Sequence, residues 1–397
     1  MRKTVRPNKA ECTGCGACAC ICPRHAITMK PDEEGFLYPQ VDGKLCIGCD
    51  LCEKRCPAGR QAEEAHPRVF GAQIKDPALR RASSSGGVFT ALARETLAKG
   101  GVVFGAAFGE GLRVEHVGAF NEEEIAPMRG SKYVQSDASD AIANAVSLLG
   151  RDIPVLFSGT PCQVDGLRAA LGGRRSERLI TVDFVCHGVP SPGVFASYIA
   201  ELERTHGQRV AAYTFRDKRL GWKNFSSVAT FEDGSEHTGT QTDEPFLYGF
   251  LQNLYLRPAC HGCTGLRGGR HSADITLADL WGAENLCPRQ NDDTGLSLVL
   301  VNTERGKEAL DACRKQLRLF TAPDLDCMAR FNPGLFKAAA PHRKRDAFFR
   351  DYARHGFVSG HVMKLLAPPG RTERALRRIL HLPAGVIRRL KKRFGTL

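Results

Sequence analysis

Apolar residues occur along most of the chain in two kinds of segment. Continuous apolar runs, such as residues 101–108 and 179–186, are typical of buried strands. Segments of the second kind, such as residues 137–149 and 191–205, have apolar residues at helical spacing, and the last of these has a proline near its first turn. Because strands and helices alternate between residues 83 and 205, the pattern predicts an α/β core with parallel strands.

The pattern changes beyond this region. Residues 208–240 alternate polar and apolar side chains around an Asp-Gly pair, which predicts antiparallel strands joined by a tight turn. Two apolar runs and a helical pattern within residues 273–317 complete the core. Residues 58–82 have no strong period, so we expect a linker, which we place at residues 63–82.

A further helix is predicted after the segment SSSGG at residues 83–87. Val88, Leu92 and Leu97 form an apolar stripe at helical spacing. Serine side chains readily accept hydrogen bonds from the free N–H groups of a first helical turn, so residues 83–85 are the expected N-cap.

The 16 cysteines of the chain are the most informative feature of its composition. Apolar residues make up 42% of the chain, which is enough for a sizeable core, but no apolar run approaches the roughly 20 residues of a membrane span. The first residues also lack the apolar segment of a secretory signal. We therefore expect a cytoplasmic protein whose clustered cysteines are metal ligands or catalysts rather than disulfides.

Two cysteine loops repeat one spacing near the start of the chain. The pattern C-x2-C-x2-C-x3-C-P runs from Cys12 to Pro23 and again from Cys46 to Pro57. Cysteine pairs also bind zinc, but zinc sites do not need four cysteines followed by proline, twice. The spacing is that of bacterial ferredoxins with two 4Fe-4S clusters, in which the fourth cysteine of each loop ligates the other cluster. The sequence thus predicts two ligand sets, which are Cys12, Cys15, Cys18 and Cys56, and Cys46, Cys49, Cys52 and Cys22.

Other residues of this region fit around the loops. Residues 27–41 predict a hairpin between them. Gly14, Gly16 and Gly48 are expected to let the backbone approach the cluster sulfurs. Cys20 is surplus to the pattern, and we expect it to take no part in ligation, although it is placed to compete for the first cluster.

The formal net charge of +13 is concentrated at the end of the chain. From Arg343 onward there are 15 Lys and Arg against 3 acidic residues, a difference of +12. The rest of the chain is therefore close to neutral, which disfavours a nucleic-acid-binding protein. Apolar residues around Pro383 form interrupted stripes among the arginines, as in a segment that lies on an anionic membrane. A solvated helix or one that docks on a partner is the alternative.

Six motifs of the larger part of the chain, in the same order, resemble one known family. They are SSSGGVFTALA, RGSKYVQS, LFSGTPCQVDGL, VDFVCHGVPSP, LRPACHGC and SADITLADLWGAE. The chain resembles the beta-subunit family of coenzyme F-420 hydrogenases and dehydrogenases, in the form with a fused N-terminal ferredoxin, over roughly residues 10–340. The resemblance implies a flavoprotein with FAD and a further 4Fe-4S cluster. Some relatives act on coenzyme F-420, and others use different acceptors, so the substrate is left open.

Four cysteines in these motifs are the candidates for the third cluster. Cys260 and Cys263 have ligand spacing, and two more cysteines follow predicted strands, where the loops of an α/β sheet build sites. Their number matches the four thiolates of a cube, and the set is Cys162, Cys186, Cys260 and Cys263. The alternative is that the first two are core residues and that the pair binds nothing.

The candidates for FAD come from three of the same motifs. The SSSGG helix start offers N–H groups and a helix dipole to a pyrophosphate, and RGSKY adds groups that hold phosphate or stack on a ring, unless it is only a solvated turn. No G-x-G-x-x-G segment is present, which disfavours a standard Rossmann site. The candidate set is Ser84, Ser85, Gly86, Gly87, Arg129, Ser131, Lys132, Tyr133, Thr160 and Gln163.

Candidates for acid–base chemistry are few. His187, next to a candidate cluster ligand, is the one candidate proton donor, and a hydrogen-bonded loop histidine is the alternative. Asp274 and Asp279 are either caps or packing residues.

Together these observations predict four parts and one main function. The parts are a dicluster ferredoxin domain at residues 1–62, the linker at 63–82, a mixed α/β catalytic domain at 83–340 and a basic amphipathic tail at 341–397. The predicted function is electron transfer between the clusters, FAD and a two-electron small-molecule acceptor, with a redox protein or ferredoxin as partner. A non-catalytic electron-transfer subunit that feeds a partner enzyme is the alternative.

Overall fold

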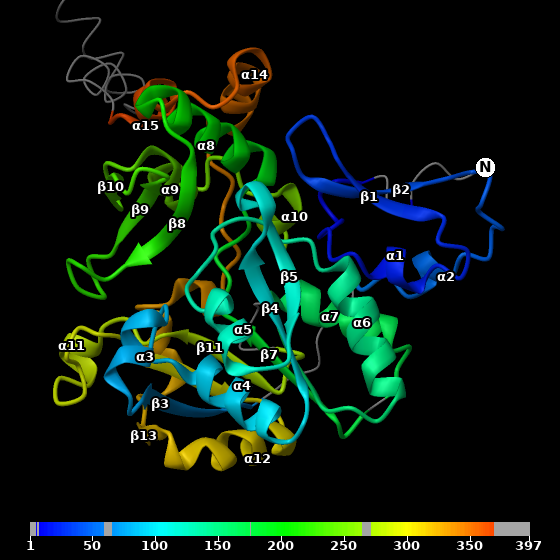
Figure 1. Cartoon of the computed structure of the whole chain (residues 1–397), viewed down its shortest axis with the longest axis vertical. Coiled ribbons are helices and arrows are strands. Elements are labelled where there is room, and N and C mark those ends of the chain that lie inside the picture. Colours follow the sequence, from blue (N-terminus) through cyan, green and yellow to red (C-terminus); the bar gives the residue numbers. More distant parts are fainter. Residues whose placement is uncertain (1–4, 6–7, 59–65, 175, 264–270, 369–397) are drawn as a thin grey trace, which may run out of the picture.

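The structure of the chain is a computed structural model that describes residue 5 and residues 8–58, 66–174, 176–263 and 271–368 (Figure 1). The interrupted stripes expected around Pro383 lie outside these residues. None of the described helices is both long and apolar enough to cross a membrane.

The N-terminal part is a small domain that contains both cysteine loops. It has two short helices, α1 (Ala17–Ile21) and α2 (Leu51–Lys54), each within one loop. Between them, β1 (Ile27–Pro31) and β2 (Leu37–Val41) form the predicted antiparallel hairpin, with Ile27 opposite Val41. The helices lie on one side of the hairpin (Figure 1).

An eight-stranded sheet forms the centre of the part of the chain that the structure describes. Its strands are β3 (Arg68–Ile74), β4 (Val102–Phe108), β5 (Val114–Ala119), β6 (Val155–Ser158), β7 (Leu179–Phe184), β11 (Ile275–Asp279), β12 (Ser297–Val301) and β13 (Leu317–Thr321). Their order is β13-β3-β12-β11-β7-β6-β4-β5. The neighbours β4, β6, β7 and β11 are parallel, which confirms the prediction for the core, and the outer pairs are antiparallel.

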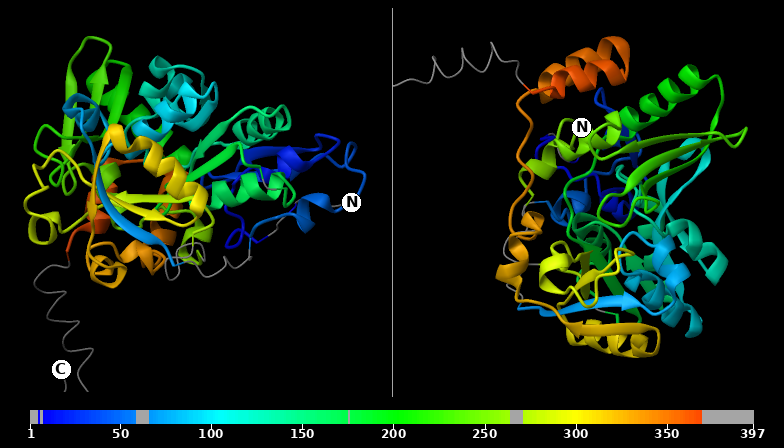
Figure 2. Two further views of the ribbon diagram at one scale, coloured as in Figure 1. Left: turned by 90° about the horizontal axis from the view of Figure 1, so that it is seen from below. Right: turned by 90° about the vertical axis from the view of Figure 1, so that its left-hand side faces the viewer.

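Helices cover both faces of this sheet. On one face, α4 (Val88–Ala98) and α12 (Glu304–Ala312) share a core with β4, β7 and β12. On the other face, α6 (Ser139–Gly150) and α7 (Pro161–Ala170) cover the next residues of β4 and β6. Helix α1 packs against α6 and α7, so the cysteine domain lies beside these two helices (Figures 1 and 2).

A second, three-stranded antiparallel sheet has the order β10-β9-β8. Its strands are β8 (Val210–Asp217), β9 (Ser226–Phe231) and β10 (Glu236–Thr240), and β9 and β10 are joined at the predicted Asp-Gly turn. The helices α8 (Pro192–His206), α9 (Pro245–Leu251), α14 (Arg345–His355) and α15 (Ser359–Leu366) contribute to the same aromatic core as this sheet. Shorter described elements are α3 (Pro77–Ala82), α5 (Glu122–Ile125), α10 (Pro258–His261), α11 (Ala283–Leu286), α13 (Leu325–Ala329) and the 3-10 turns at Glu110–Leu112, Ala126–Met128, Cys313–Lys315 and Pro333–Leu335.

The expected linker differs from the observed structure. Residues 63–82 contain β3, which pairs with β12 on one side and β13 on the other, and α3. A strand that lies between two partner strands and is buried does not alternate polar and apolar residues. Because β3 also mixes apolar residues with glycine and glutamine, its hydrophobic pattern is too weak to predict a strand.

The expected basic tail also differs in its first part. Within residues 341–368, α14 and α15 bury Phe348, Phe349 and Val362 in the aromatic core. The basic residues of this segment lie around that apolar face, as in any surface helix of a folded domain. For residues 369–397, which lie outside the described residues, the tail stays a prediction.

Candidate cofactor sites

The first cysteine loop folds around a buried site. Cys12 and Cys15 are buried, and Cys18 is partly buried. Burial raises the pKa of the Cys18 thiol, and the charges of Cys15, Cys12 and Cys56 raise it further. Cys56, from the second loop, therefore lies close to the first loop, as the crossed ligand pattern predicts.

The second loop surrounds a cavity of about 320 Å³. Four thiols line this cavity, and they are the other predicted set, Cys22, Cys46, Cys49 and Cys52. Cys22 comes from the first loop and accepts a hydrogen bond of 3.3 Å from the backbone N–H of Ala26. The exposure differs between the two sites, because Cys46 and Cys49 are exposed whereas Cys12 and Cys15 are buried.

Gly14 is needed for a reason that the sequence did not reveal. Its φ of 68° lies in the left-handed region, where glycine is favoured. A Cβ at this position would lie 2.4 Å from Nε2 of Gln135 and 2.8 Å from Nη1 of Arg257. The missing side chain therefore makes room for two side chains of the large domain.

The third candidate set gathers from three separate segments. Cys162 stands in the first turn of α7, Cys186 follows β7, and Cys260 lies in α10, three residues before Cys263. Burial raises the pKa of Cys186 well above its ordinary value, and the charges of the other three thiols raise it further. The backbone N–H of Val189 donates to the Sγ of Cys260 over 3.5 Å. The four predicted thiols thus lie within reach of one another.

These thiols suit clusters better than a bare ion. Buried thiolates that repel one another need a cationic centre, and iron supplies it. Among the described residues, no three His, Cys, Asp or Glu side chains gather closely enough to hold one metal ion. In a cube each thiolate binds a different iron, so the four sulfurs surround a larger volume.

A capping box positions Cys162 at the start of α7. The Thr160 N–H donates to Oε1 of Gln163 over 3.0 Å, and the Thr160 hydroxyl lies 3.1 Å from the Sγ of Cys162. Gln163 also donates to the Ser136 hydroxyl over 2.9 Å. The polar atoms of Thr160 and Gln163 are therefore used to hold the helix start, which leaves them less available to a flavin than the sequence suggested.

A large cavity of about 570 Å³ opens between the two sheets and α4. Cys162, Cys186 and His187 line it, and nine of the ten predicted FAD residues line it too. These nine are Ser84, Ser85, Gly87, Arg129, Ser131, Lys132, Tyr133, Thr160 and Gln163. The volume lies in the range of ligand and cofactor sites.

Gly86 is the predicted FAD residue that does not line this cavity. Its backbone N–H donates to the Ser297 hydroxyl over 2.9 Å, and a Cβ would lie 2.3 Å from the carbonyl oxygen of Ala72. Gly86 therefore lets the segment pack against β3 and β12. The helix start also differs from the expected serine cap, because Ser83 is the C-cap of α3 and the N-cap of α4 is Gly87, at a φ of 83°.

The open N-terminus of α4 fits an anionic group. No side chain caps it, so the first-turn N–H groups have no side-chain acceptor, and the hydroxyls of Ser84 and Ser131 lie 2.9 Å apart near this end. Nη2 of Arg129 is buried without a hydrogen-bond partner, and its ion-pair partner Glu122 is 3.8 Å away. A phosphate would satisfy both features.

Lys132 and Tyr133 have other contacts. The Lys132 ammonium donates to the carbonyl oxygens of Pro127, Arg129 and Gly130 over 2.6, 3.0 and 3.3 Å, and burial lowers its pKa to about 7. It therefore ties the RGSKY turn together. The Tyr133 ring lies 4.7 Å from the ring of Phe250, and burial raises the pKa of its hydroxyl.

Two further residues of the cavity lining were not predicted as a pair. Arg216 on β8 donates from Nη1 to Asp279 at the end of β11 over 2.6 Å, and both line the cavity. Nε of Arg216 and Oδ1 of Asp279 are buried without hydrogen-bond partners. Asp274, in contrast, accepts hydrogen bonds from Thr181 and Thr303, which gives it a packing role. The sequence does not separate the two aspartates, because Asp279 gains its partner only where β8 of the small sheet meets β11 of the large sheet.

His116 was also missed, since β5 has no motif around it. Its ring lines the cavity, Nε2 lies 2.9 Å from the carbonyl oxygen of Ser158, and Nδ1 lies 3.0 Å from the Ser136 hydroxyl. Burial lowers the pKa of His116 to about 4, so this imidazole is neutral at neutral pH. Burial also lowers the pKa of His187, whose ring contacts Phe250 edge-on at 5.1 Å.

Family models match most of the chain. Residues 11–60 match the model of a 4Fe-4S dicluster domain. Residues 69–143 and 154–325 match the N-terminal and C-terminal models of the coenzyme F420 hydrogenase/dehydrogenase beta subunit, which together span more than half of the chain. The chain belongs to this beta-subunit family. It carries an N-terminal 4Fe-4S dicluster ferredoxin domain, as the two cysteine loops predict.

The beta-subunit chain is similar to one component of a known dehydrogenase. It is 24% identical over 330 residues to a subunit of the F(420)H(2) dehydrogenase of Methanosarcina mazei, covering 79% of this chain and 85% of the relative. It is 38% identical over 52 residues to the VorC subunit of the ketoisovalerate oxidoreductase of Methanothermobacter marburgensis, covering 13% of this chain and 66% of the relative. A solved chain of the F420-reducing hydrogenase complex of Methanosarcina barkeri has a TM-score of 0.48 and 19% identity, covering 68% of this chain and 89% of that chain.

In this beta-subunit chain, α7 lies next to the first cysteine loop and also contributes Cys162 to the third group of thiols and to the cavity lining. A Cβ at Gly166, one turn along α7 from Cys162, would lie 3.1 Å from the Sγ of Cys15. The charges of both Cys15 and Cys260 act on Cys162, and Cys162 lines the large cavity. Cys20, by contrast, packs against the core under α6 and α7.

Proposed function

We propose that this chain is an iron–sulfur flavoprotein oxidoreductase that passes electrons between its ferredoxin domain and a two-electron acceptor bound at the large cavity. When bound, the clusters would carry single electrons and FAD would exchange one or two. The family match supports an iron–sulfur electron-transfer role. The cavity and the third group of thiols support the flavin and the further cluster.

The observation that carries the proposal is the position of Cys162. This residue lies near Cys15 of the first cysteine loop, belongs to the third group of thiols, and lines the cavity. We assign the inner cluster to Cys12, Cys15, Cys18 and Cys56, the outer cluster to Cys22, Cys46, Cys49 and Cys52, and the third to Cys162, Cys186, Cys260 and Cys263. One helix, α7, then joins the ferredoxin domain to the cavity.

The residues at the α4 end of the cavity would hold the phosphates of FAD. The free N–H groups at Gly87 and Val88, the hydroxyls of Ser84 and Ser131, and the Arg129 guanidinium form that end. Other lining residues, among them Arg216 and Asp279, are left for the ring or the acceptor. His187, the proton donor predicted from the sequence, also lines the cavity, and burial lowers the pKa of its imidazole, which disfavours the protonated ring that a donor needs.

A partner would meet the chain at the outer cysteine loop. Cys46 and Cys49 are exposed, and the neighbouring Leu45 and Ile47 are exposed large apolar residues, 43% and 65% accessible. Charged residues usually cover such a surface, so the apolar loop favours contact with a redox protein. The similar dehydrogenase chain is named for F(420)H(2), which makes coenzyme F420 one candidate acceptor.

The test is the cofactor content of anaerobically purified protein. We expect about 12 iron per chain, three cubes of four, and bound FAD. The variant Cys260→Ala should lose about a third of the iron and keep the ferredoxin signal. About 8 iron that the substitution leaves unchanged would rule out the third cluster.

A second function, a non-catalytic electron-transfer subunit, is favoured by one observation: the similar dehydrogenase chain is itself named a subunit. This function predicts iron without flavin and no turnover of any small acceptor by the isolated chain. Flavin analysis and an anaerobic assay with reduced coenzyme F420 and a viologen dye therefore separate the two functions.

A further inference from the structure

Arg257 is a completely buried cation at the junction of the two domains. It directly precedes α10, the short helix that carries Cys260. Among the described residues, no carboxylate forms an ion pair with it. A buried charge is costly unless a group of opposite charge or a set of hydrogen bonds compensates it.

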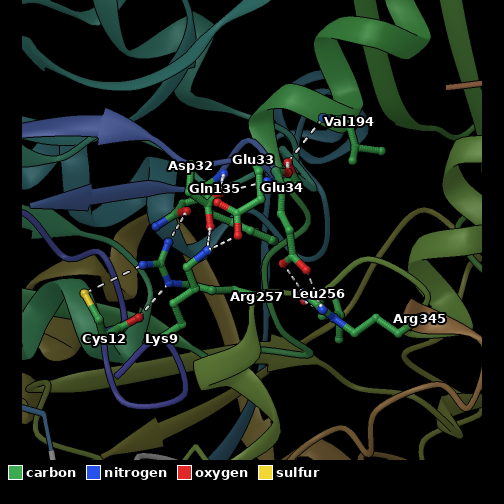
Figure 3. A network of polar contacts seen from close by, with 12 residues as sticks. Lys9, Cys12, Asp32, Glu33, Glu34, Gln135, Val194, Leu256, Arg257 and Arg345 are labelled. Carbon is green, nitrogen blue, oxygen red and sulfur yellow. Dashed lines mark hydrogen bonds and ion pairs between the residues drawn. The ribbon is translucent and has the colours of Figure 1, made fainter. Parts of the chain in front are cut away.

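Two of the three guanidinium nitrogens donate to the first cysteine loop, residues 12–23 (Figure 3). Nε donates to the carbonyl oxygen of Cys12 over 2.7 Å, and Nη2 donates to the Sγ of the same residue over 3.7 Å. Nη1 donates to Oε1 of Gln135 over 2.8 Å. The guanidinium also lies 4.1 Å from the ring centre of Tyr38, on the β1–β2 hairpin. These contacts fix the group in one orientation.

Arg257 is also connected to the third group of thiols. Its backbone N–H donates to the carbonyl oxygen of Val189 over 3.0 Å, and the N–H of Val189 donates to the Sγ of Cys260 over 3.5 Å. Arg257 therefore stands between the inner site and the third site. The sequence separation from Cys12 is 245 residues, so only the docking of the ferredoxin domain creates this arrangement.

We propose that Arg257 is the countercharge of the inner cluster and that it raises the reduction potential of this cluster. The proposal rests on the assignment of a cluster to Cys12, Cys15, Cys18 and Cys56 under the proposed function. Reduction adds negative charge to a cluster, and a buried cation stabilises that charge more strongly than one in water does. Hydrogen bonds to the cluster sulfurs and the exposure to solvent are the protein's means of setting the potential. Arg257 acts here as a positioning residue and takes no part in ligation.

The experiment is a redox titration of anaerobically prepared full-length protein with dithionite, followed by electron paramagnetic resonance. In Arg257→Met and Arg257→Gln, the ratio of oxidised to reduced inner cluster at a fixed potential should rise at least tenfold. For a one-electron couple this is a shift of about 59 mV to more negative potential. Arg257→Lys, which keeps the charge, should recover most of the shift.

Two controls separate a direct effect from a loosened domain contact. Glu34→Gln weakens the docking of the hairpin without touching Cys12, and it should leave the potential of the inner cluster unchanged. Cys49→Ser marks the titration step of the outer cluster, which should not move in the Arg257 variants.

Two results would overturn the inference. Neutral Arg257 variants that keep their full iron content and the wild-type potential would do so, and so would an equal shift in Glu34→Gln. A wild-type chain without iron would overturn the proposed function itself, and iron analysis of the wild-type protein detects that failure before any titration. If Arg257→Met is not recovered folded, Arg257→Gln, which can still donate to the Cys12 carbonyl, decides the question.

Discussion

Arg345 on α14 forms an ion pair with Glu34 at the tip of the β1–β2 hairpin, and its Nη1 donates to Oε1 of Glu34 over 2.8 Å (Figure 3). Both side chains are largely buried, and Nε of Arg345 also donates to the carbonyl oxygen of Leu256 over 3.2 Å. The ferredoxin domain is thus fastened to a helix more than 300 residues away in the sequence. The segment after residue 341 therefore belongs to the folded body as far as α15.

We expect truncation after residue 341 to unfold the large domain. Removing α14 and α15 takes away Phe348, Phe349 and Phe357, which are buried in the aromatic core, and leaves Glu34 unpaired. Loss of one buried phenylalanine side chain typically costs about 3–5 kcal/mol. The summed loss is comparable to the whole stability of a typical domain, about 5–15 kcal/mol. Thermal unfolding followed by circular dichroism measures it.

A chain that ends at residue 368 is the control, since it keeps every described contact of both helices. It should unfold at the temperature of the full-length protein and keep its iron. A truncation at 341 that retains the wild-type unfolding temperature would contradict the packing of α14 and α15.

We expect Arg129→Gln to weaken FAD binding about 10- to 100-fold. The substitution removes a charged donor whose side chain lines the cavity, and a hydrogen bond to a charged group contributes about 1.5–3 kcal/mol. Flavin fluorescence during titration of flavin-free protein measures the affinity. Arg94→Gln is the matched control, because Arg94 pairs with the same Glu122 but does not line the cavity. Equal losses in both variants would place the phosphates elsewhere.

We expect His116 to make the stability of the fold depend on pH. Its pKa is lowered to about 4 by burial, whereas a histidine in the unfolded chain titrates near its ordinary value of about 6.5. The unfolded state therefore binds more protons between these values, so the contribution is fully present above pH 6.5 and is lost as the pH falls toward 4. At pH 5 the loss is about 2 kcal/mol, from 1.36 kcal/mol per pKa unit.

The variant His116→Gln isolates this contribution, since glutamine keeps a donor for the Ser158 carbonyl but does not titrate. Urea unfolding at pH 7 and pH 5 should show a smaller drop in the variant than in the wild type. Equal drops in the two proteins would mean that His116 takes up its proton without cost in the folded state.

We expect Cys20→Ala to keep the full iron content, whereas Cys18→Ser should lose about four iron. Cys20 packs against the core under α6 and α7, while the thiols of Cys12, Cys15 and Cys56 surround Cys18. Removing one partly buried sulfur should cost about 1 kcal/mol of stability. Iron analysis with an assay of acid-labile sulfide checks the pair. Loss of iron from the alanine variant would make Cys20 a ligand.

Local spacing was enough to predict several parts of this protein. The cysteine loops and the hairpin between them depend on residues less than about 50 positions apart, and the ferredoxin spacing rule predicts which cysteines share a cluster. The alternating strands and helices between α6 and α8 follow from hydrophobic periodicity, which is also local. The candidate FAD residues came instead from the resemblance of their motifs to the beta-subunit family, and nine of the ten line one cavity.

Other parts were decided by contacts between distant segments. The strand β3 has a weak pattern of its own and exists because β12 and β13 offer hydrogen bonds on both sides. The sequence does not distinguish Gly86 from Gly87, and only the close approach of Gly86 to the carbonyl oxygen of Ala72 gives Gly86 a packing role. Arg216 and Asp279 become a pair only where the two sheets meet.

The sequence by itself determined the two ferredoxin sites, because ligand spacing within a tight loop fixes which thiols can reach a cluster. Only the tertiary structure decided that the inner site is buried against α7 and that Arg257 lies beside Cys12. It also decided that part of the basic segment is core. The physical reason is that burial and charge compensation depend on which surfaces meet, and a one-dimensional pattern records the composition of each surface but not its partner.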